Sequence, residues 1–247
     1  MEHNREFYQR VADSIEALPY PRLRYDKEKN KTLVFIDTRF DPFYKLLFRS
    51  FLWSVGEDWN FTIFCPQDVW DEQMHPMLQD MDVEARYIQL REVFEKDNIR
   101  YSHMLTSKNF YEQIPEDYLF LFQSDSQVFG RFDPVFLQYP YLGALWLNGE
   151  IGNGGTCLRK TRIMETLCEK YGDTLPRYPE DCFFGEALKR EGLLEDIPPN
   201  IAHRFSIENL YCPHLNIEPV YGHKAWNSLR QHTLWYFDQR LREWVNA

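Results

Sequence analysis

Apolar residues form short continuous runs in the first half of the chain, and the segments between them show helical spacing. Four runs predict strands, at 32–40, 60–65, 85–90 and 117–125. The last is the strongest, because its nearly continuous apolar residues are typical of a strand buried on both faces. Helices are expected at 41–56, where Pro42 suits a first turn, and around 67–80. Strands that alternate with helices at this spacing predict an α/β fold with a central, mostly parallel sheet flanked by helices.

The pattern changes after residue 125. We expect a strand, a glycine-rich loop, a short strand and two helices, at 141–147, 148–155, 156–160, 161–172 and 179–192. The tail is again helical and rich in rings. Near the start, apolar residues fall at helical spacing, namely Phe7, Val11, Ile15 and Leu18. Residues 1–24 are therefore predicted to be an amphipathic helix with a connector, and residues 25–247 a single domain that includes the C-terminal helix.

Charge and composition limit the classes of partner. The 247 residues include 28 Lys and Arg against 38 Asp and Glu, which gives a formal net charge of −10, and no basic block is present. A nucleic-acid-binding protein would show a basic face, so this class is not expected. The N-terminus is too polar for a signal peptide, and no segment resembles a membrane span. Peripheral association with a membrane stays open, as does the oligomeric state.

Cysteine usage indicates the compartment. The five cysteines are odd in number, scattered and never in a CxxC pair, which argues against a disulfide framework or a zinc knuckle. Reduced, mostly buried thiols are typical of the cytoplasm, so we predict a cytoplasmic protein. Aromatic residues make up 17% of the chain, and they serve either core packing or the binding of flat polar ligands such as sugars.

Two of the predicted strands end in charged residues. The first leads into Asp37, Thr38 and Arg39, and the fourth leads into Asp125. Ligands of open α/β sheets bind beyond the carboxyl ends of the strands, so these residues could meet a phosphorylated ligand. Asp125 could hold Mg²⁺ or Mn²⁺ through a carboxylate oxygen. The alternative is an aspartate that caps the following turn, and this stretch alone slightly favours the cap.

The glycine-rich stretch "GNGGTCLRK" follows at 152–160. Gly154 and Gly155 are expected to permit positive φ and to let the backbone approach a ligand closely. Asn153 offers donors and acceptors that suit the recognition of hydroxyl groups. The alternative is an ordinary hairpin turn, which this sequence also forms readily.

Two further motifs carry ionisable groups. Glu180 and Asp181 open a predicted helix, where they either complement the helix dipole or supply a general base. His223 and Lys224 follow a glycine, a pattern that suits a metal ligand beside a phosphate-pairing ammonium. A lone histidine is more often structural, and the spacing does not decide between these roles.

Taken in order, these motifs resemble a known pattern. The pieces are "IDTR", "FQSDSQVF", "GNGGTCLRK", "PEDCFFGEAL", "AHRFSIE" and "GHKAW", and they extend over residues 32–227. The chain resembles the sugar-nucleotide-dependent glycosyltransferases of the GT-A fold, a Rossmann-like architecture. It is more closely similar to a family of glycosyltransferase-like proteins named only for an uncharacterised domain.

The resemblance implies transfer of a sugar from a nucleotide diphosphate, by analogy a UDP-sugar, to an acceptor hydroxyl in polysaccharide or glycan synthesis. On the donor side it implies that Thr38 and Arg39 contact the nucleotide and that Lys224 contacts the diphosphate. Asp125 would occupy the acidic motif, which usually reads Asp-x-Asp, and His223 would complete the coordination of Mn²⁺ or Mg²⁺.

The remaining implied roles concern the sugar and the acceptor. The resemblance implies that Asn153, Gly154 and Gly155 border both, and that Asp181 is the base of an inverting enzyme. If Asp181 only caps its helix, a retaining enzyme is the alternative. The acidic motif has a single carboxylate, because Gln127 stands at the second acidic position. A non-catalytic protein that binds sugar nucleotides or glycans is therefore the second hypothesis. A nucleotidyltransferase ranks below both, since no glycine-rich loop with Arg and Lys follows "TLVFID".

Overall fold

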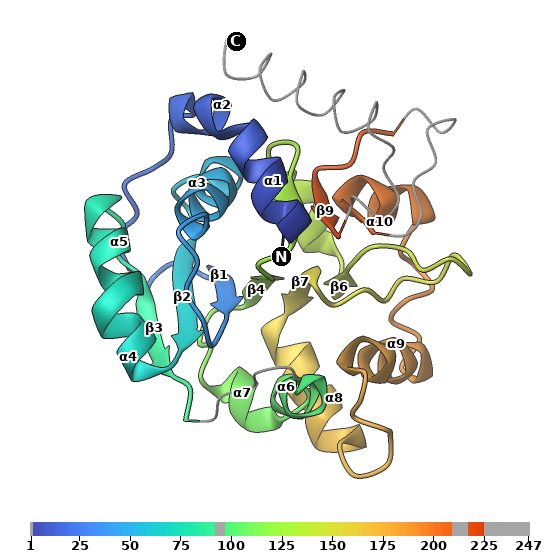
Figure 1. Cartoon of the computed structure of the whole chain (residues 1–247). Coiled ribbons are helices and arrows are strands. Elements are labelled where there is room, and N and C mark those ends of the chain that lie inside the picture. The colour runs from blue at the N-terminus through green and yellow to red at the C-terminus, as the bar shows by residue number, and fades with distance from the viewer. Residues whose placement is uncertain (1, 92–96, 209–216, 225–247) are drawn as a thin grey trace.

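The computed structural model of the chain describes residues 2–91, 97–208 and 217–224 (Figure 1). Six strands form its main sheet in the order β3-β2-β1-β4-β7-β6. Their bounds are β1 Lys31–Ile36, β2 Asn60–Cys65, β3 Arg86–Gln89, β4 Tyr118–Phe122, β6 Tyr141–Leu142 and β7 Thr156–Lys160. β3, β2, β1 and β4 are parallel neighbours, whereas β7 runs antiparallel to both β4 and β6. The predicted α/β fold with a mostly parallel sheet is confirmed.

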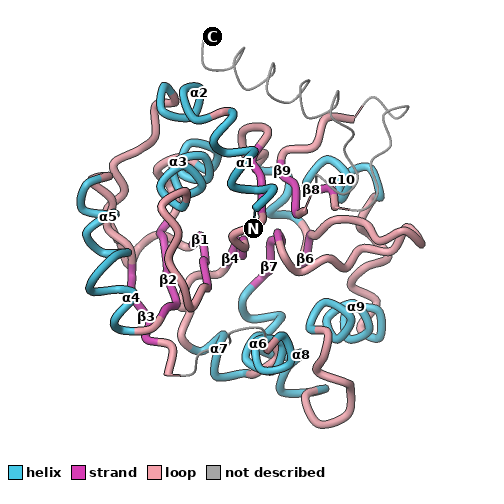
Figure 2. The backbone as a smooth tube through the Cα atoms, in the orientation of Figure 1, coloured by secondary structure: helices cyan, strands magenta, loops and turns pink. Residues whose placement is uncertain are grey.

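Helices lie against this sheet (Figure 2). Three short strands form a second sheet. The helices are α1 Glu2–Arg10, α2 Ala12–Ala17, α3 Tyr44–Val55, α4 Gln67–Val69, α5 His75–Asp80, α6 Asn98–Leu105, α7 Lys108–Glu112, α8 Thr161–Tyr171, α9 Glu180–Arg190 and α10 Pro199–Phe205. A π-helical turn at Trp70–Met74 joins α4 to α5, and a 3₁₀ turn covers Pro134–Gln138. The second sheet has the order β5-β9-β8, with bounds β5 Ser126–Val128, β8 Ser206–Ile207 and β9 Tyr221–His223.

Alternation along the buried strands places aromatic side chains on both faces of the main sheet. On one face, Phe61 of β2 packs against Phe48 of α3, with 5.0 Å between the ring centroids. On the other face, Phe64 packs against Phe110 of α7 at 5.1 Å. Successive side chains of a strand point to opposite faces, so a strand between two helical layers must be apolar throughout. This explains the continuous apolar runs in the sequence.

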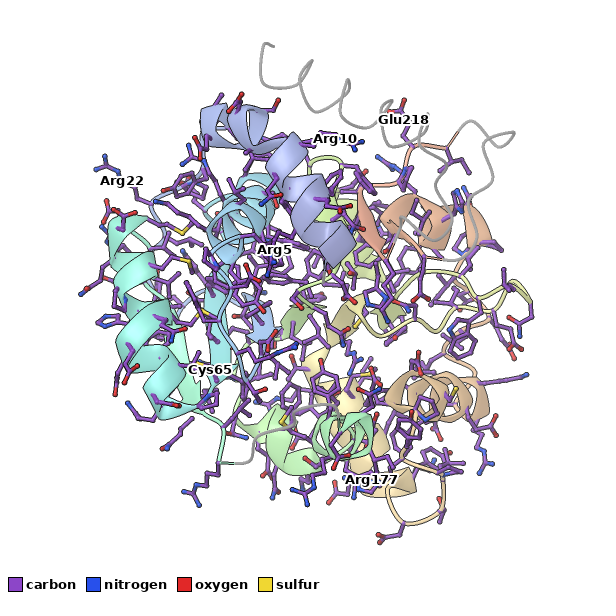
Figure 3. All side chains as sticks on the ribbon, viewed as in Figure 1. Arg5, Arg10, Arg22, Cys65, Arg177 and Glu218 are labelled. Atoms are coloured by element: carbon purple, nitrogen blue, oxygen red, sulfur yellow. The ribbon has the colours of Figure 1, made fainter. Side chains whose placement is uncertain are left out.

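The N-terminal segment is part of the same core. Its predicted helix is divided into α1 and α2. Val11, Ile15 and Leu18 of the predicted apolar stripe have no exposed surface, whereas Phe7 is only partly buried and the neighbouring Tyr8 is fully buried. The Tyr8 hydroxyl donates a hydrogen bond to the Ser126 carbonyl oxygen, at 3.2 Å. The N-terminal helix therefore supports the segment that follows β4. Figure 3 shows the contrast between this interior, which includes Cys65, and exposed side chains such as Arg22.

Several elements differ from the sequence expectations. The strand predicted at 141–147 is only β6, after which Leu145 and Ile151 form an isolated bridge. Helices α6, α7 and α10 were not predicted from the sequence. The predicted C-terminal helix lies outside the described residues. Within the ranges that the structure describes, no helix has the length and apolar character needed to cross a membrane.

Candidate active site

The strand order reverses between β1 and β4, and two loops with predicted site residues meet there. Such a reversal leaves a crevice outside the carboxyl ends of the strands, where ligands of open α/β sheets bind. Asp37 follows β1, and Ser124 and Asp125 follow β4. Tyr44 of α3 connects the loops, because its hydroxyl donates a hydrogen bond to Asp37 Oδ2 at 2.7 Å and also interacts with Ser124.

The small sheet brings the predicted motif at 122–129 and the described part of the motif at 222–226 together. β5 pairs with β9 so that Ser126 lies opposite His223. The Lys224 backbone N–H donates a hydrogen bond to the Asp125 carbonyl oxygen at 3.0 Å. The Nζ atom of Lys224 lies 4.0 Å from Asp125 Oδ2. Lys224 has a φ of +49°, a left-handed conformation that is strained for a lysine. Asp125, His223 and Lys224 are therefore neighbours in space, as the resemblance implied.

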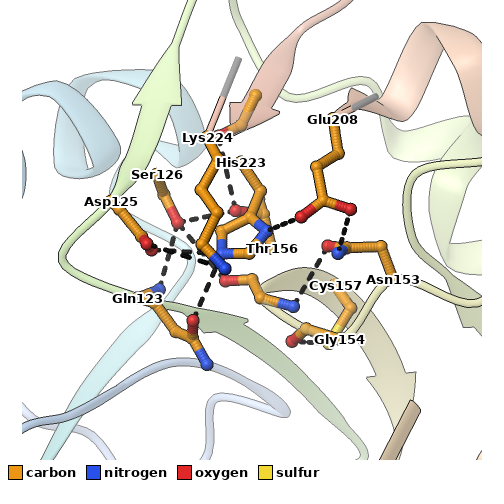
Figure 4. A network of polar contacts seen from close by, with 12 residues as sticks. Gln123, Asp125, Ser126, Asn153, Gly154, Thr156, Cys157, Glu208, His223 and Lys224 are labelled. Carbon is orange, nitrogen blue, oxygen red and sulfur yellow. Dashed lines mark hydrogen bonds and ion pairs between the residues drawn. The ribbon is translucent and has the colours of Figure 1, made fainter. Parts of the chain in front are cut away.

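A continuous series of polar contacts extends from Asp125 (Figure 4). Nε2 of His223 lies 3.1 Å from Asp125 Oδ1, and Nδ1 of the same ring lies 3.0 Å from Glu208 Oε1. The other oxygen of Glu208 accepts a hydrogen bond from Asn153 Nδ2 at 2.7 Å. Asn153 Oδ1 in turn accepts one from the Gly155 backbone N–H at 3.1 Å. The network joins residues of four chain segments and is largely buried.

The charges in this network favour an imidazolium between two carboxylates. Burial lowers the pKa of His223, but the neighbouring Asp125 and Glu208 outweigh it, so the pKa is raised above its ordinary value. Burial likewise opposes ionisation of Asp125, but His223 and Lys224 outweigh it and lower its pKa. The two carboxylates therefore favour the protonated form of His223 relative to an ordinary buried histidine.

The residues fit a divalent ion only in part. Over the described ranges, no group of three or more His, Cys, Asp or Glu side chains is arranged to hold a metal ion by itself. Asp125 Oδ1 is buried without a hydrogen-bond partner among the described residues, 3.1 Å from His223 Nε2. Octahedral Mg²⁺ has ligands at about 2.1 Å, so adjacent ligands lie about 3 Å apart. Glu208 at Nδ1 orients the ring as carboxylates do in metal sites. The pair thus suits an ion completed by substrate oxygens and water.

Gln127 does not act as a second ligand at the acidic motif. It lies on β5 with 1% of its surface exposed, and its Nε2 donates a hydrogen bond to the Asp125 carbonyl oxygen at 3.1 Å. The side chain at the position that usually carries the second acid is therefore buried and hydrogen-bonded to the backbone, and it does not face a shared ion with Asp125.

A cavity of about 250 Å³ opens beside this network. It is lined by Asn98, Tyr101, Ser102, Gln123, Asn153, Gly155, Tyr178, Pro179, Glu180, Asp181, Glu208, His223 and Lys224. Most of these side chains are polar, which suits a ligand rich in hydroxyl groups. Asp181 is partly buried at the start of α9, and burial first, with a contribution from Glu208, raises its pKa. A carboxylate with a raised pKa is a stronger base than an exposed one.

The glycines serve close packing rather than a left-handed turn, which corrects the sequence expectation. Within the described residues, the glycines with positive φ are Gly56, Gly149 and Gly192. A Cβ atom on Gly155 would lie 2.2 Å from His223 Nε2, and one on Gly154 would lie 2.3 Å from Glu180 Oε1. Both positions therefore exclude any side chain, because functional side chains fill the space. Gly155 lines the cavity itself, whereas Gly154 borders it through Glu180.

Thr38 and Arg39 lie after β1 and do not line this cavity. The Arg39 backbone N–H and Nε both face Asp37 Oδ1, at 3.0 and 3.3 Å, and half of the side chain is exposed. The contacts with Asp37 thus hold Arg39 at the mouth of the crevice, just after the end of β1.

Helix α6 separates this cavity from a second one of about 540 Å³. The second cavity is lined by Phe64, Gln89, Leu90, Arg91, Arg100, His103, Met104, Ser107, Asn109, Phe110 and Gln113. None of these described lining residues is acidic, whereas the first cavity contains three carboxylates. Residues three or four apart share a helix face, so Asn98, Tyr101 and Ser102 face the first cavity and Arg100, His103 and Met104 face the second.

Sequence reasoning missed Glu208 and the contribution of α6. Glu208 ends "AHRFSIE", a motif that was noted without a role for its acid. An acid directly after a short apolar strand was the available signal, similar to Asp125 after β4. Tyr101 gives no such local signal, because its contact with Gln123 Nε2, at 3.1 Å, depends on the fold.

Comparison with known proteins identifies one family and no curated relative. A family model described as "Protein of unknown function (DUF5672)" matches residues 83–220. No curated protein matches the chain. Matches among solved structures comprise 115 chains, including the apo-form glycosyltransferase GlyE of Streptococcus pneumoniae TIGR4. That match has a TM-score of 0.43 and 14% identity and covers 88% of this chain. The chain spans 63% of the length of the GlyE chain, which is less than two thirds.

Proposed function

The chain belongs to the family described as "Protein of unknown function (DUF5672)", and we propose that it is a glycosyltransferase that moves a sugar from a nucleotide diphosphate to an acceptor hydroxyl. One observation carries the proposal. A single polar cavity collects Asn153, Asp181, His223 and Lys224 from separate chain segments, next to the point where the strand order reverses. A carboxylate base and cations for a leaving diphosphate thereby face one space.

Lys224 and Arg39 are the cations proposed to stabilise the leaving diphosphate. As the bond between the anomeric carbon and the phosphate oxygen breaks, negative charge develops on the diphosphate. Lys224 beside Asp125, and Arg39 at the mouth of the crevice, are positioned to stabilise this charge. A divalent cation held by Asp125 and His223 would supply further positive charge at the same oxygens.

Asp181 accounts for activation of the acceptor. Its carboxylate accepts the proton of the acceptor hydroxyl while that oxygen forms the new bond to the anomeric carbon. The nucleoside diphosphate leaves from the opposite side, so the configuration at the carbon inverts. The burial that raises the pKa of Asp181 also makes it a stronger base. Asn153 and Glu208 offer hydrogen-bond partners for sugar hydroxyls within the same cavity.

The nucleoside is assigned to the side of the crevice formed by the ends of β1, β2 and β3. Thr38 and Arg39 lie there, and the second cavity adds Arg91 and Arg100 with an apolar floor that includes Phe64. A uracil ring with its ribose has this combination of an apolar face and hydrogen-bonding edges. We assign a UDP-sugar as the donor and a glycan as the acceptor on these grounds.

A binding protein without catalytic activity is the second candidate. The observation in its favour is the buried, neutral Gln127 at the position of the usual second acid. In this case Asp181 would contribute hydrogen bonds to a bound glycan and would not be needed for chemistry.

Thermal-shift measurements test donor binding first. A screen of nucleoside diphosphates and sugar nucleotides, with and without Mn²⁺, should identify ligands that raise the melting temperature by mass action. Release of nucleoside diphosphate is then measured with a panel of glycan acceptors. Release that requires both an acceptor and Asp181 supports the enzyme. Binding without turnover, unchanged in Asp181→Asn, supports the binding protein. Stabilisation by none of the ligands contradicts the enzyme and a binding protein for sugar nucleotides.

A further inference from the structure

Arg159 is the only buried arginine or lysine within the described part of the chain, with no exposed surface. It lies on β7, and its guanidinium is enclosed by aromatic rings, 4.7 Å from the Phe184 ring centroid and 5.6 Å from that of Tyr141. Nη1 donates a hydrogen bond to the Tyr111 hydroxyl at 2.9 Å, and Nε donates one to Cys157 Sγ at 3.1 Å. Nη2 has no hydrogen-bond partner among the described residues.

The carboxylate that balances this charge belongs to Glu180. Glu180 Oε1 lies 3.9 Å from Arg159 Nη2, and Oε2 accepts a hydrogen bond from the Ser102 hydroxyl at 3.4 Å. Burial raises the pKa of Glu180, and Arg159 counteracts that effect. Truncating one member of such a buried pair leaves the other charge without compensation, which is costly in a low-dielectric interior.

The same guanidinium contacts the first turn of α9 twice. Glu180 and Phe184 are four residues apart, so they lie on one face of the helix and both meet Arg159. Two contacts one turn apart define the rotation of the helix about its axis. Asp181 is rotated by about 100° from Glu180 in a helix of 3.6 residues per turn. Both residues line the polar cavity, and with Glu180 held by Arg159 this rotation sets the direction in which Asp181 faces it.

Gly154 completes the arrangement. A Cβ atom on Gly154 would lie 2.3 Å from Glu180 Oε1 and 3.3 Å from Arg159 Nη2, so the Glu180 side chain occupies the space above this glycine. The residue before it, Asn153, is bonded to Glu208 in the network that leads to Asp125. The ion pair thus sits between the start of α9 and the loop that carries the network.

From these contacts we infer that Arg159 is a positioning residue, which sets the orientation of α9 through Glu180 and Phe184 so that Asp181 faces the cavity. The assignment of Asp181 as the base rests on the proposed glycosyltransferase function. The positional part does not, because it concerns only the geometry of α9.

The exposed thiol of Cys182 reports on this geometry independently of turnover. Its backbone N–H donates a hydrogen bond to Asp181 Oδ1 at 2.9 Å, and burial first, then Asp181 and Glu180, raises the pKa of the thiol. Cys65, Cys157 and Cys168 are buried, and Cys212 lies outside the described residues and is replaced by serine in the test background. The rate of alkylation by iodoacetamide against pH then gives the pKa of Cys182, since the thiolate is the reactive form.

The first variant is the double replacement Arg159→Met with Glu180→Met. Hydrophobic replacement of a whole buried ion pair is often neutral for stability, so the urea midpoint should return close to that of the parent, whereas Glu180→Gln alone lowers it. Despite this recovery, the apparent pKa of Cys182 should stay displaced from the parent value in the double variant. In a turnover assay, kcat should fall with the donor KM unchanged. Gly154→Ala should reproduce the displacement, because it expels the Glu180 carboxylate without altering either charge.

The control is Glu186→Gln, which removes another glutamate of α9 that pairs with Arg190 at the surface, at 2.7 Å. It should leave the alkylation profile unchanged. A parent-like Cys182 profile in Gly154→Ala would overturn the inference. The double variant contributes the stability and turnover comparison, because it also removes the charge of Glu180, which acts on the thiol directly. If the parent shows no turnover with any donor, only the proposed function fails, and the alkylation profiles still decide the role of Arg159.

Discussion

His223 Nδ1 lies 3.0 Å from Glu208 Oε1, which directs the other ring nitrogen toward Asp125. The contact joins a strand near the end of the described chain to an acid that follows β8, and it raises the pKa of the histidine against the effect of burial. The candidate site is therefore organised around a buried imidazole whose protonated form is favoured by two carboxylates.

This arrangement predicts how stability depends on pH in the absence of divalent ions. The pKa of His223 is higher in the folded than in the unfolded state, so its contribution is fully present below the unfolded value of about 6.5. The contribution is lost as the pH rises through the folded pKa. Urea unfolding in EDTA should show a free energy of unfolding that declines above about pH 6.5. His223→Gln should flatten the decline, whereas the exposed control His75→Gln should keep it; an unchanged slope in His223→Gln would refute the assignment.

Removal of the base should abolish turnover without abolishing donor binding. Asp181→Asn is expected to lower kcat by about 10²- to 10⁴-fold, the usual contribution of a general base. The thermal shift caused by the donor should persist, because the cations of the donor side are unchanged. Asp173→Asn, an exposed acid before α9, serves as the matched control and should retain full activity. Equal kcat values in the two variants would contradict the role of Asp181.

The dependence of the reaction rate on pH should report the pKa of the Asp181 carboxylate. Burial raises the pKa of Asp181, so activity should fall on the acid side at a pH above the ordinary aspartate value of about 3.9. Glu208 contributes to the shift, and Glu208→Gln should therefore move the acid limb of kcat/KM to lower pH. A limb that moves upward, or that is independent of both residues, would point to another base.

Two glycine substitutions should have effects of opposite sign. Gly155→Ala places a methyl group 2.2 Å from the position of His223 Nε2 and should lower the free energy of unfolding by about 1–3 kcal/mol, as overpacking does. Gly185→Ala lies within α9, where the nearest atom to an added Cβ is 3.6 Å away. It should raise stability by about 0.5–1 kcal/mol through helix propensity. Urea denaturation of both variants measures the difference, and a neutral Gly155→Ala would mean that the ring is not held at this position.

Restoring a second acid at the usual motif position should not restore metal binding. Gln127 is buried on β5, so Gln127→Asp places a carboxylate where the side chain cannot reach water. We expect a loss of at least about 1–3 kcal/mol of stability and no gain in Mn²⁺ affinity by calorimetry with UDP present. Asp125→Asn should reduce that affinity, and tighter Mn²⁺ binding by a stable Gln127→Asp protein would show that this position faces the ion.

Local sequence patterns were sufficient to predict the strands of the main sheet, apart from the length of β6. β2 coincides with the predicted run at 60–65, because a strand covered on both faces is mostly apolar. β7 coincides with the short strand predicted at 156–160, although it carries the buried Arg159. The start of α9 was also predicted from the sequence, since Pro179 and two acids are typical of a helix N-terminus. The sequence did not reveal the roles of Gly154 and Gly155. A turn with positive φ and a tightly packed site both require glycine, so the residue type alone does not distinguish them.

The sequence by itself therefore determined the strands of the main sheet apart from the length of β6, most of the longer helices and the identity of the ionisable groups, all of which depend on neighbours a few residues apart. Only the tertiary structure decided which groups meet. β9 reaches β5 across the chain, Glu208 comes between His223 and Asn153, and Arg159 balances Glu180 beneath Gly154. These contacts depend on strand pairing and helix packing between distant segments, and the hydrophobic pattern of a segment does not specify its partner.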